Sequence, residues 1–233
     1  MKFIKRFIAF VLIIVIAAAG VVIYGGWGKY RSAIEALPLD EAISNIRNME
    51  NFTPYQDISP MFINAVVSVE DKRFFHHRGV DTLGVLRAVL YNIRTKSLSE
   101  GGSSITQQVA KNIYFMGEST LQRKIAEVFV ASDIEKTCTK EEILELYCNI
   151  IYYGSGYYNI YDASTGYFGK KPSELTDYEA TMLAGIPNAP SAYSPNTNRE
   201  LAEKRQEKVL ETMVENGYIT KDDADEIISE KNL

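Results

Sequence analysis

The residues best suited to chemistry lie in one short stretch, VEDKRFFHHRGVD, residues 69–81. Within it, Glu70 and Asp71 stand near three cations, a Phe-Phe pair and both histidines of the chain, His76 and His77. Glu70 ends an apolar run. Burial against such a run raises the pKa of a carboxyl group and neighbouring cations lower it, so Glu70 could be tuned towards general-base catalysis. A helix end whose charges face water explains the same residues, and this stretch alone does not decide between the two.

A second polar segment, EGGSSITQQVAKN, spans residues 100–112. Paired glycines before Ser103 and Ser104 can let backbone N–H groups and hydroxyls converge on an anion at a helix start. Gln107 and Gln108 are neutral hydrogen-bonding groups of the kind that bind sugars, and Lys111 follows one turn later. The segment lacks the GxxxxGK[ST] pattern of a nucleotide-binding P-loop. By itself it is also compatible with an ordinary capped loop.

Three further segments carry charge at helical spacing. In RKIAE, Arg123, Lys124 and Glu127 reach one side of a helix, as either a phosphate clamp with a second carboxylate or a surface salt bridge. In KEEILELYCN, Glu145 and Asn149 lie four residues apart, which favours a structural role. RQEKVL, beginning at Arg205, indicates an amphipathic helix and no more.

The elements that must position these side chains are predicted to be helices. Caps stand at Ser59, followed by proline, and at Asp81, Ser104, Thr139 and Thr176, and period-two strand patterns are almost absent. Gly217 is expected to close one late helix, and a last one spans residues 221–231 after Thr220. The sequence therefore predicts a mostly α domain.

The N-terminal segment is predicted to cross a membrane. Cations precede an uncharged run over residues 7–28, and a helix of about twenty residues spans about 30 Å. The cations favour a cytoplasmic amino end and an extracytoplasmic domain, with the helix retained as a single-pass anchor. A cleaved signal peptide is the alternative, since Ala17–Ala19 resembles a cleavage site. We assign residues 1–28 to the basic end and anchor, 29–58 to a polar stalk and 59–233 to the catalytic domain.

Composition excludes some classes of function. A net charge of −5 over 233 residues argues against nucleic-acid binding. Cys138 and Cys148 flank a predicted helix start, about 13 Å apart along the helix, so no disulfide is expected and Cys148 is predicted to be a core residue. Two cysteines and two adjacent histidines give no zinc-binding spacing.

Taken in order, the five segments resemble the five motifs of the peptidoglycan glycosyltransferases of family 51, which also form the front half of bifunctional penicillin-binding proteins. The stretch YFGKKPSELTDYEATMLAGIPNAPSAYSP is similar to the family's sequence between its fourth and fifth motifs, and the resemblance covers residues 59–213. It implies a lysozyme-like helical lobe and a smaller membrane-associated lobe with a catalytic cleft between them.

The resemblance also implies the chemistry. The enzyme would polymerise lipid II, a disaccharide-pentapeptide on undecaprenyl pyrophosphate, at the outer membrane face. Glu70 would deprotonate the acceptor GlcNAc 4-hydroxyl, which attacks MurNAc C1 with inversion to form a β-1,4 bond. Lys111, Arg123 and Lys124 would face the pyrophosphate, and Glu127 would support that site or its metal. Sugar or phosphate would be held by Ser103, Thr106, Gln107 and Gln108. Structural or cleft-wall roles would fall to Asp71, Phe74, His77, Gly79, Glu145, Asn149 and Arg205.

Cofactors and partners follow from the same resemblance. No cofactor is required by the sequence; a divalent cation, Mg or Mn, is compatible with it, and no metal ligand is assigned. The expected partners are lipid II, the growing lipid-linked glycan, the membrane and cell-wall synthesis proteins. Without SxxK or KTG motifs, a complete chain would be a monofunctional polymerase, whereas a piece of a longer protein could precede a penicillin-binding domain.

Some positions depart from the family pattern. Ser104 replaces a common threonine, His76 an often acidic residue, and Cys148 a usual leucine. Asn159 stands at a usual glycine, where its tolerance of left-handed backbone would make the change harmless. Residues 113–116 could dip into the membrane interface or form a buried helix end.

Two rival functions remain at this point. A lysozyme-type, glycan-cleaving enzyme also needs a glutamate in a helical cleft, but it does not need the cations Lys111, Arg123 and Lys124. A catalytically silent cell-wall scaffold would need neither Glu70 nor Glu127.

Overall fold

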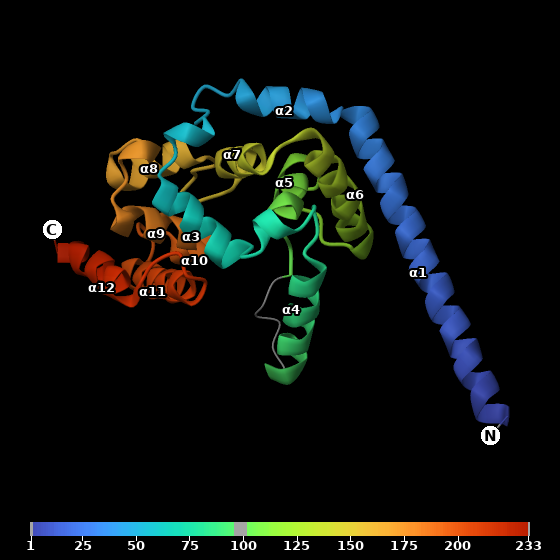
Figure 1. The fold of residues 1–233 in the computed structure, drawn as a ribbon. Helices are drawn as coiled ribbons and strands as arrows, with labels where there is room; N and C mark the ends of the chain where they lie inside the picture. The colour runs from blue at the N-terminus through green and yellow to red at the C-terminus, as the bar shows by residue number, and fades with distance from the viewer. Residues whose placement is uncertain (1, 96–101, 233) are drawn as a thin grey trace.

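The computed structural model describes residues 2–95 and 102–232, and that part of the chain contains α-helices and short 3₁₀ turns but no strand (Figure 1). The α-helices are α1 (Lys2–Ala36), α2 (Leu39–Arg47), α3 (Pro60–Glu70), α4 (Thr82–Thr95), α5 (Ile105–Tyr114), α6 (Leu121–Thr137), α7 (Lys140–Ile150), α8 (Ile160–Phe168), α9 (Asp177–Gly185), α10 (Pro190–Tyr193), α11 (Arg199–Glu215) and α12 (Lys221–Ser229). The 3₁₀ turns are η1 (Tyr55–Asp57), η2 (Phe74–His76), η3 (Pro172–Glu174), η4 (Ile186–Asn188) and η5 (Glu230–Asn232). The prediction of a mostly α fold is confirmed.

Local capping explains where these helices begin. The Ser59 hydroxyl accepts from the Phe62 N–H ahead of a proline at the first position of α3. Reciprocal capping boxes start α5 at Ser104, α7 at Thr139 and α9 at Thr176. These contacts satisfy N–H groups that have no partner within the helix, and they confirm the sequence-based starts.

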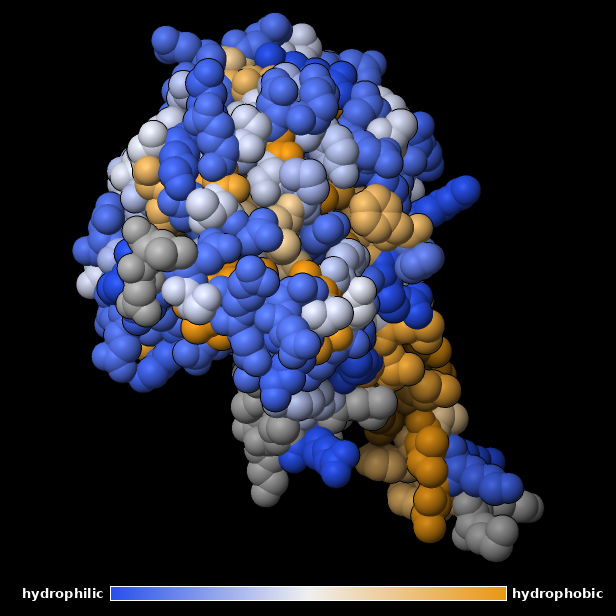
Figure 2. All heavy atoms as spheres, turned by 60° about the vertical axis from the view of Figure 1, so that its left-hand side comes forward, coloured by the Kyte–Doolittle hydropathy of each residue, from blue (hydrophilic) through white to orange (hydrophobic). Residues whose placement is uncertain are grey.

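The long helix α1 contains the predicted anchor and continues beyond it. Its segment from Phe3 to Ala36 is long and apolar enough to cross a membrane. Figure 2 shows it as a hydrophobic arm beside a largely hydrophilic body. Its C-terminal part packs along α6, where Trp27 meets Phe129 edge-on and Tyr30 meets it at a tilt, with ring centroids 5.0 and 5.5 Å apart. The anchor helix thus ends as part of the folded body.

The segment expected as a stalk contains helix α2 and η1. Leu39, Ile43 and Ile46 of α2 belong to the main hydrophobic core, and α2 contacts α7. Their burial removes apolar side chains from water, so this segment is held against the body.

Helix α3 occupies the middle of the molecule. It packs against α9 and α11 on one side, while α5, α6 and α7 pack on one another to form a neighbouring group (Figure 1). Phe62 of α3 is fully buried in the core shared by the two groups, and a smaller cluster joins α9, α11 and α12. The C-terminal end of α3 therefore lies between two helical groups, and that end carries Glu70.

Three details of the sequence-based prediction can now be judged. Cys138 and Cys148 are free thiols, and Cys148 lies fully in the core, as expected. Asn159 does not adopt a left-handed backbone: its φ is −148°, and its side chain caps α8 by accepting from the Asp162 N–H. Phe115 forms a buried helix end, while Met116 is exposed.

Candidate active site

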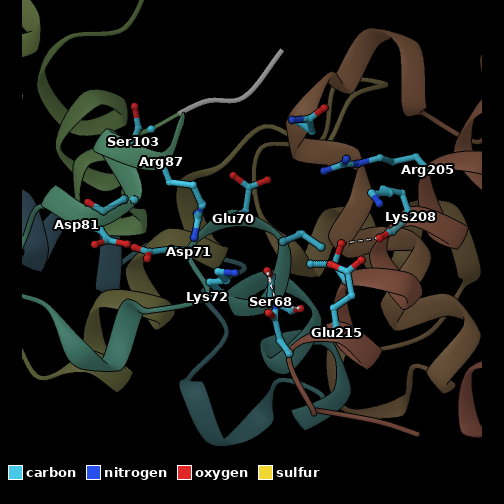
Figure 3. A pocket seen from close by; sticks show the side chains of 17 residues that line it. Ser68, Glu70, Asp71, Lys72, Asp81, Arg87, Ser103, Arg205, Lys208 and Glu215 are labelled. Atoms are coloured by element: carbon cyan, nitrogen blue, oxygen red, sulfur yellow. Dashed lines mark hydrogen bonds between the residues drawn. The ribbon is translucent and has the colours of Figure 1, made fainter. Parts of the chain in front are cut away.

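A cavity of about 410 Å³ opens beside the end of α3 (Figure 3). The charged and hydroxyl side chains on its wall include Glu70, Lys72, Arg87, Ser103, Arg205 and Lys208. A second cavity, of about 330 Å³ between α2 and the ends of α5 and α7, is lined among the described residues by apolar and neutral polar side chains only. Acid/base chemistry needs a titratable group, so the first cavity is the candidate active site.

Glu70 is the last residue of α3 and is partly buried at the cavity wall. Its Oε2 accepts a hydrogen bond of 2.7 Å from Nε2 of Gln108 on α5. Burial raises the pKa of Glu70 above its usual range and Asp71 adds to the rise, while Gln108 and Arg205 act in the opposite direction. A carboxylate with a raised pKa takes up a proton more readily, which suits a general base.

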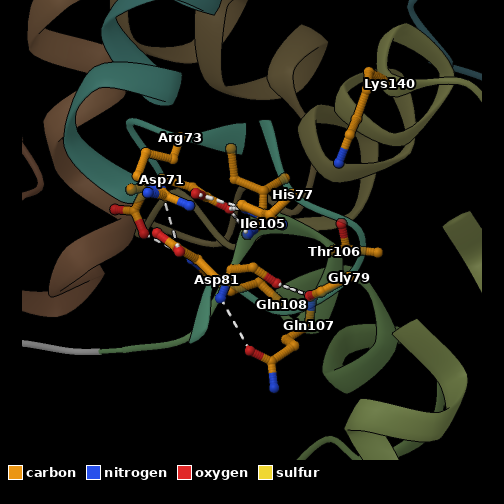
Figure 4. A network of polar contacts seen from close by, with 12 residues as sticks. Asp71, Arg73, His77, Gly79, Asp81, Ile105, Thr106, Gln107, Gln108 and Lys140 are labelled. Atoms are coloured by element: carbon orange, nitrogen blue, oxygen red, sulfur yellow. Dashed lines mark hydrogen bonds and ion pairs between the residues drawn. The ribbon is translucent and has the colours of Figure 1, made fainter. Parts of the chain in front are cut away.

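Asp71, the next residue, fixes the end of α3 to the start of α5 (Figure 4). Its Oδ2 accepts from the Ile105 N–H at 3.1 Å, and both carboxylate oxygens lie 2.9 Å from His77 Nε2. A negative charge at a helix N-terminus is favourable, and these bonds hold α3 and α5 in register. Glu70 is thereby placed opposite Gln108.

Tertiary contacts also fix the segment from Phe74 to Gly79 that follows Asp71. The Ser104 hydroxyl donates to the carbonyl of Gly79, whose φ of +74° favours glycine. A Cβ at Gly79 would lie 3.3 Å from the backbone of Ala131. Phe74 is fully buried, with Lys140 Nζ 4.2 Å from its ring centroid. These contacts agree with structural roles for Phe74, His77 and Gly79.

On α6, Glu127 is only 1% exposed and lies between two cations. Arg123 Nη1 bonds its Oε1, and Lys124 Nζ lies 2.9 Å from its Oε2. Lys124 also donates to the hydroxyl of Ser103, which lines the cavity. Glu127 therefore compensates and orients the cations, and Lys124 connects this cluster to the cavity wall.

Two residues predicted to hold substrate lie inside the protein instead. Thr106 is fully buried and donates to Glu135 at 2.6 Å, and Gln107 is 2% exposed and completes the cap of α5. Their position in sequence beside Gln108 concealed that, of the three, it is Gln108 that bonds Glu70. We correct their assignment to structural roles.

Other predicted residues are distributed as follows. Ser103 and Arg205 line the cavity, and Arg205 also donates to the Gly185 carbonyl at 3.3 Å. Lys111 is exposed on α5 and is not on the cavity wall. Glu100 and Gly101 of the second motif lie outside the described residues.

Glu145 and Asn149 tie α7 to the chain that precedes α3. The Asn149 side chain exchanges two hydrogen bonds of 2.8 Å with the backbone of Thr53, and Glu145 accepts from the Tyr55 N–H at 2.9 Å. Neither residue lines the cavity beside Glu70, and Asn149 lines the second cavity; these bonds are of the kind expected for the structural role that their spacing indicated.

Sequence reasoning missed three cavity cations: Lys72, Arg87 and Lys208. Lys72 and Lys208 lie within recognised motifs, two residues after Glu70 and three after Arg205, and could have been found there. Arg87 lies in a helix interpreted only for its apolar spacing, and nothing in the local sequence distinguishes it.

The described side chains do not fit a metal site. In residues 2–95 and 102–232, no three histidine, cysteine, aspartate or glutamate side chains gather in a way that could hold a metal ion. Asp71 is engaged by His77, and Glu127 by Arg123 and Lys124. The described side chains therefore do not form a protein-built metal centre.

Comparison with known proteins identifies the family. The transglycosylase family profile matches residues 39–214. A chain from Cupriavidus necator named as a transglycosylase is 41% identical over 217 residues, covering 93% of both chains. Penicillin-binding protein 1A of Neisseria lactamica is 47% identical over 180 residues, which are 77% of this chain and 23% of that protein, and the Neisseria gonorrhoeae protein is 46% identical over the same length.

Among solved structures, penicillin-binding protein 1A from Haemophilus influenzae aligns with 77% of this chain and 17% of its own, at 23% identity and a TM-score of 0.44. The sequence matches, rather than this alignment, carry the assignment. Together with a glutamate at the wall of a cation-lined cavity, they show that the chain belongs to the transglycosylase family and is a peptidoglycan glycosyltransferase of family 51.

Proposed function

We propose that the enzyme polymerises lipid II into glycan strands by inverting transfer, with Glu70 as the general base. The observation that carries the proposal is the placement of Glu70. It is partly buried, its pKa is raised, and it lies on the wall of a cavity that is also lined by cations. A base and cations in one cavity suit a reaction that removes a proton and expels an anion.

The proposed step balances as follows. Glu70 takes the proton of the acceptor GlcNAc 4-hydroxyl, and the oxygen attacks C1 of the donor MurNAc. The bond from C1 to the pyrophosphate oxygen breaks, and the lipid pyrophosphate leaves with the electron pair. Attack opposite an α-linked leaving group gives a β-1,4 bond.

The residues around Glu70 prepare it for this step. Asp71 holds the end of α3 against α5, so that Gln108 can bond one carboxylate oxygen of Glu70 and orient the other. Arg205 limits how far the pKa of Glu70 rises. Lys124, fixed by Glu127, supports Ser103 at the wall, where it would stabilise negative charge on the leaving group.

The N-terminal helix supports a membrane-bound substrate. We propose that α1 spans the cytoplasmic membrane once, with its amino end in the cytoplasm, because Lys2, Lys5 and Arg6 precede the apolar segment. The catalytic body would then face the outer surface, where lipid II, the growing glycan and other cell-wall synthesis proteins would meet it.

The experiment is polymerisation of labelled lipid II by the detergent-solubilised protein, with products separated by size and then treated with muramidase. The wild type should produce a ladder of muramidase-sensitive glycan, and Glu70→Gln should not. Lack of polymer from folded wild-type protein, with and without added Mg²⁺ or Mn²⁺, would reject the proposal. Release of fragments from isolated cell wall in the same sample would favour the glycan-cleaving alternative.

A further inference from the structure

One tyrosine hydroxyl in the core has no hydrogen-bond partner. Tyr147 lies on α7, its side chain is 0% exposed, and its hydroxyl oxygen is buried without a donor or acceptor in the part of the chain that the structure describes. A buried polar group left unpaired costs free energy, and native proteins pair nearly all such groups. The hydroxyl of Tyr147 therefore points to a partner that it meets in another state of the protein.

The carboxylate whose charge acts on this hydroxyl belongs to Glu70. Burial raises the pKa of Tyr147 well above its usual value, and the charge of Glu70 raises it further. Tyr147 belongs to the same core as Val67 of α3 and Val109 of α5, and α5 packs directly on α7. Tyr147 is not on the cavity wall, so it approaches Glu70 from the core side.

Glu70 can accept a further hydrogen bond. Its Oε2 accepts from Gln108, and its Oε1 has no donor among the described residues. The Tyr147 donor and this acceptor are thus both unsatisfied, and they are near enough for the charge of Glu70 to act on the hydroxyl. An ionised carboxylate accepts stronger hydrogen bonds than a protonated one, so pairing the two groups gains most when Glu70 carries its charge.

We propose that Tyr147 is a positioning residue for Glu70: when Glu70 is ionised, the Tyr147 hydroxyl donates a hydrogen bond to its carboxylate from the core side. The inference rests on the proposed function, which makes Glu70 the general base. Donors from two helices, Gln108 on α5 and Tyr147 on α7, then fix the plane of the carboxylate. Each of its oxygens keeps a second lone pair, and one that faces the cavity takes the proton.

The other ionisable groups around Glu70 are the same with and without the Tyr147 hydroxyl. On the cavity wall they are Asp71 and Lys72 after α3, Asp81 and Arg87 at α4, and Arg205, Lys208 and Glu215 on α11. Burial raises the pKa of Glu70, Gln108 and Arg205 lower it, and Asp71 raises it. Removing the Tyr147 hydroxyl alters none of these charges, so a change in the pKa of Glu70 would report the proposed hydrogen bond.

The test is the pKa of Glu70, measured without turnover. Full-length protein in detergent, labelled with ¹³C at its glutamate carboxyl carbons, is titrated by NMR, and the Glu70 signal is the one missing from Glu70→Gln. Tyr147→Phe keeps the ring and removes the hydroxyl. It should raise the pKa of Glu70 by about one pH unit, because a hydrogen bond to a carboxylate favours the ionised form. The acidic limb of the polymerisation rate should move upwards with it, at unchanged KM for lipid II.

Tyr153→Phe is the matched control. Tyr153 is also 0% exposed, but its hydroxyl donates to the Cys148 carbonyl at 3.3 Å. Burial raises the pKa of Tyr153, and Cys148 and Tyr147 rather than Glu70 add to the rise. Tyr153→Phe removes the same atom from the same core and should leave the pKa of Glu70 at its wild-type value.

A second measurement needs no change at Tyr147. In wild type labelled with ¹³C at tyrosine Cζ, one signal should move with the pKa of Glu70, and in Glu70→Gln it should stay fixed. If no tyrosine signal followed the ionisation of Glu70, the inference would be wrong even where Tyr147→Phe did not fold.

The outcomes distinguish this inference from the proposed function. If wild type polymerises lipid II while Tyr147→Phe keeps the wild-type pKa of Glu70, Tyr147 does not position the base and the polymerase stands. A lower rate with an unshifted pH profile would likewise leave Tyr147 only a packing role. If wild type makes no polymer, but Tyr147→Phe and not Tyr153→Phe raises the pKa of Glu70, the contact stands and the polymerase is rejected.

Discussion

Two glutamates of the chain, Glu70 and Glu127, stand at positions where the motifs of its family also carry glutamate. They differ in exposure and in the charge of their neighbours. Glu70 lies at a cavity wall with a neutral amide as its hydrogen-bond donor. Glu127 is 1% exposed and is paired with both Arg123 and Lys124. The same side chain thus accepts from a neutral amide at the end of α3 and from two cations on α6.

The comparison shows how the surroundings of a carboxylate group determine the role it can take. A carboxylate at a cavity wall without a paired cation can exchange a proton with a substrate, whereas a buried one between two cations holds them in place. Under the proposed function, Glu70 is therefore the group expected to react, and Glu127 the group expected to organise the cations.

Removing the reactive group should have the largest effect on activity. Glu70→Gln keeps the shape of the side chain and its bond with Gln108 but cannot accept the proton, so the rate of polymerisation should fall by about 10²–10⁴-fold. Product ladders from labelled lipid II measure it. If Glu70→Gln retained more than a tenth of wild-type activity, Glu70 would not be the general base.

Removing the organising group should act on stability as well as rate. Glu127→Gln leaves Arg123 and Lys124 without their counter-charge; since both cations are partly exposed to water, the loss of the charged hydrogen bonds should cost about 1–3 kcal/mol. Denaturant unfolding measures the loss. Glu127→Gln that unfolds like wild type yet makes no polymer would show that Glu127 reacts directly, which would break the comparison.

The raised pKa of Glu70 predicts a pH dependence with a definite sign. Its carboxyl group holds a proton more tightly in the folded than in the unfolded protein, so its ionisation lowers stability as pH rises through the folded pKa. Glu70→Gln should therefore be more stable than wild type at pH 8, with the advantage disappearing near pH 4. Thermal unfolding at the two pH values measures this.

The same shift moves the rate profile. Polymerisation by the wild type should fall on acidification at a pH above the usual glutamate pKa of about 4.3, because the base is then protonated. If the rate fell only below about pH 4.3, the pKa of Glu70 would not be raised. The two glutamates would then differ less than the structure indicates.

A smaller effect is expected beside the site. Thr106→Val removes the bond to Glu135, which should cost about 1 kcal/mol of stability and change the rate of polymerisation less than twofold. Unfolding and product ladders again measure it. A large loss of rate without loss of stability would return Thr106 to the substrate-binding residues.

Sequence reasoning succeeded where the physics is local. The caps at Ser104, Thr139 and Thr176 need only residues a few positions away, and the sequence therefore predicted those helix starts. The position of Glu70 at a helix end was predicted because the end of an apolar run is visible in the sequence, and α3 ends at this residue.

It failed where the decisive neighbour is distant in the chain. Thr106 and Gln108 look equivalent in sequence, but the packing of α5 against α6 and α7 buries the first and leaves the second facing Glu70. Arg87 lies 17 positions after Glu70, and only the arrangement of α3 and α4 brings both to one cavity. Which side chains are buried and which line the cavity depends on tertiary contacts, and the local sequence pattern does not encode these.

The close contact between α1 and α6 has a mechanical consequence. A Cβ at Gly26 would lie 2.5 Å from Ile125, so the two helices meet too closely there for a larger residue. Helix α1 runs unbroken into this contact, without a hinge that would let the body swivel on its anchor. A spanning helix tilts to match bilayer thickness, so in a thinner membrane α6, with Arg123 and Lys124, would tilt together with the anchor.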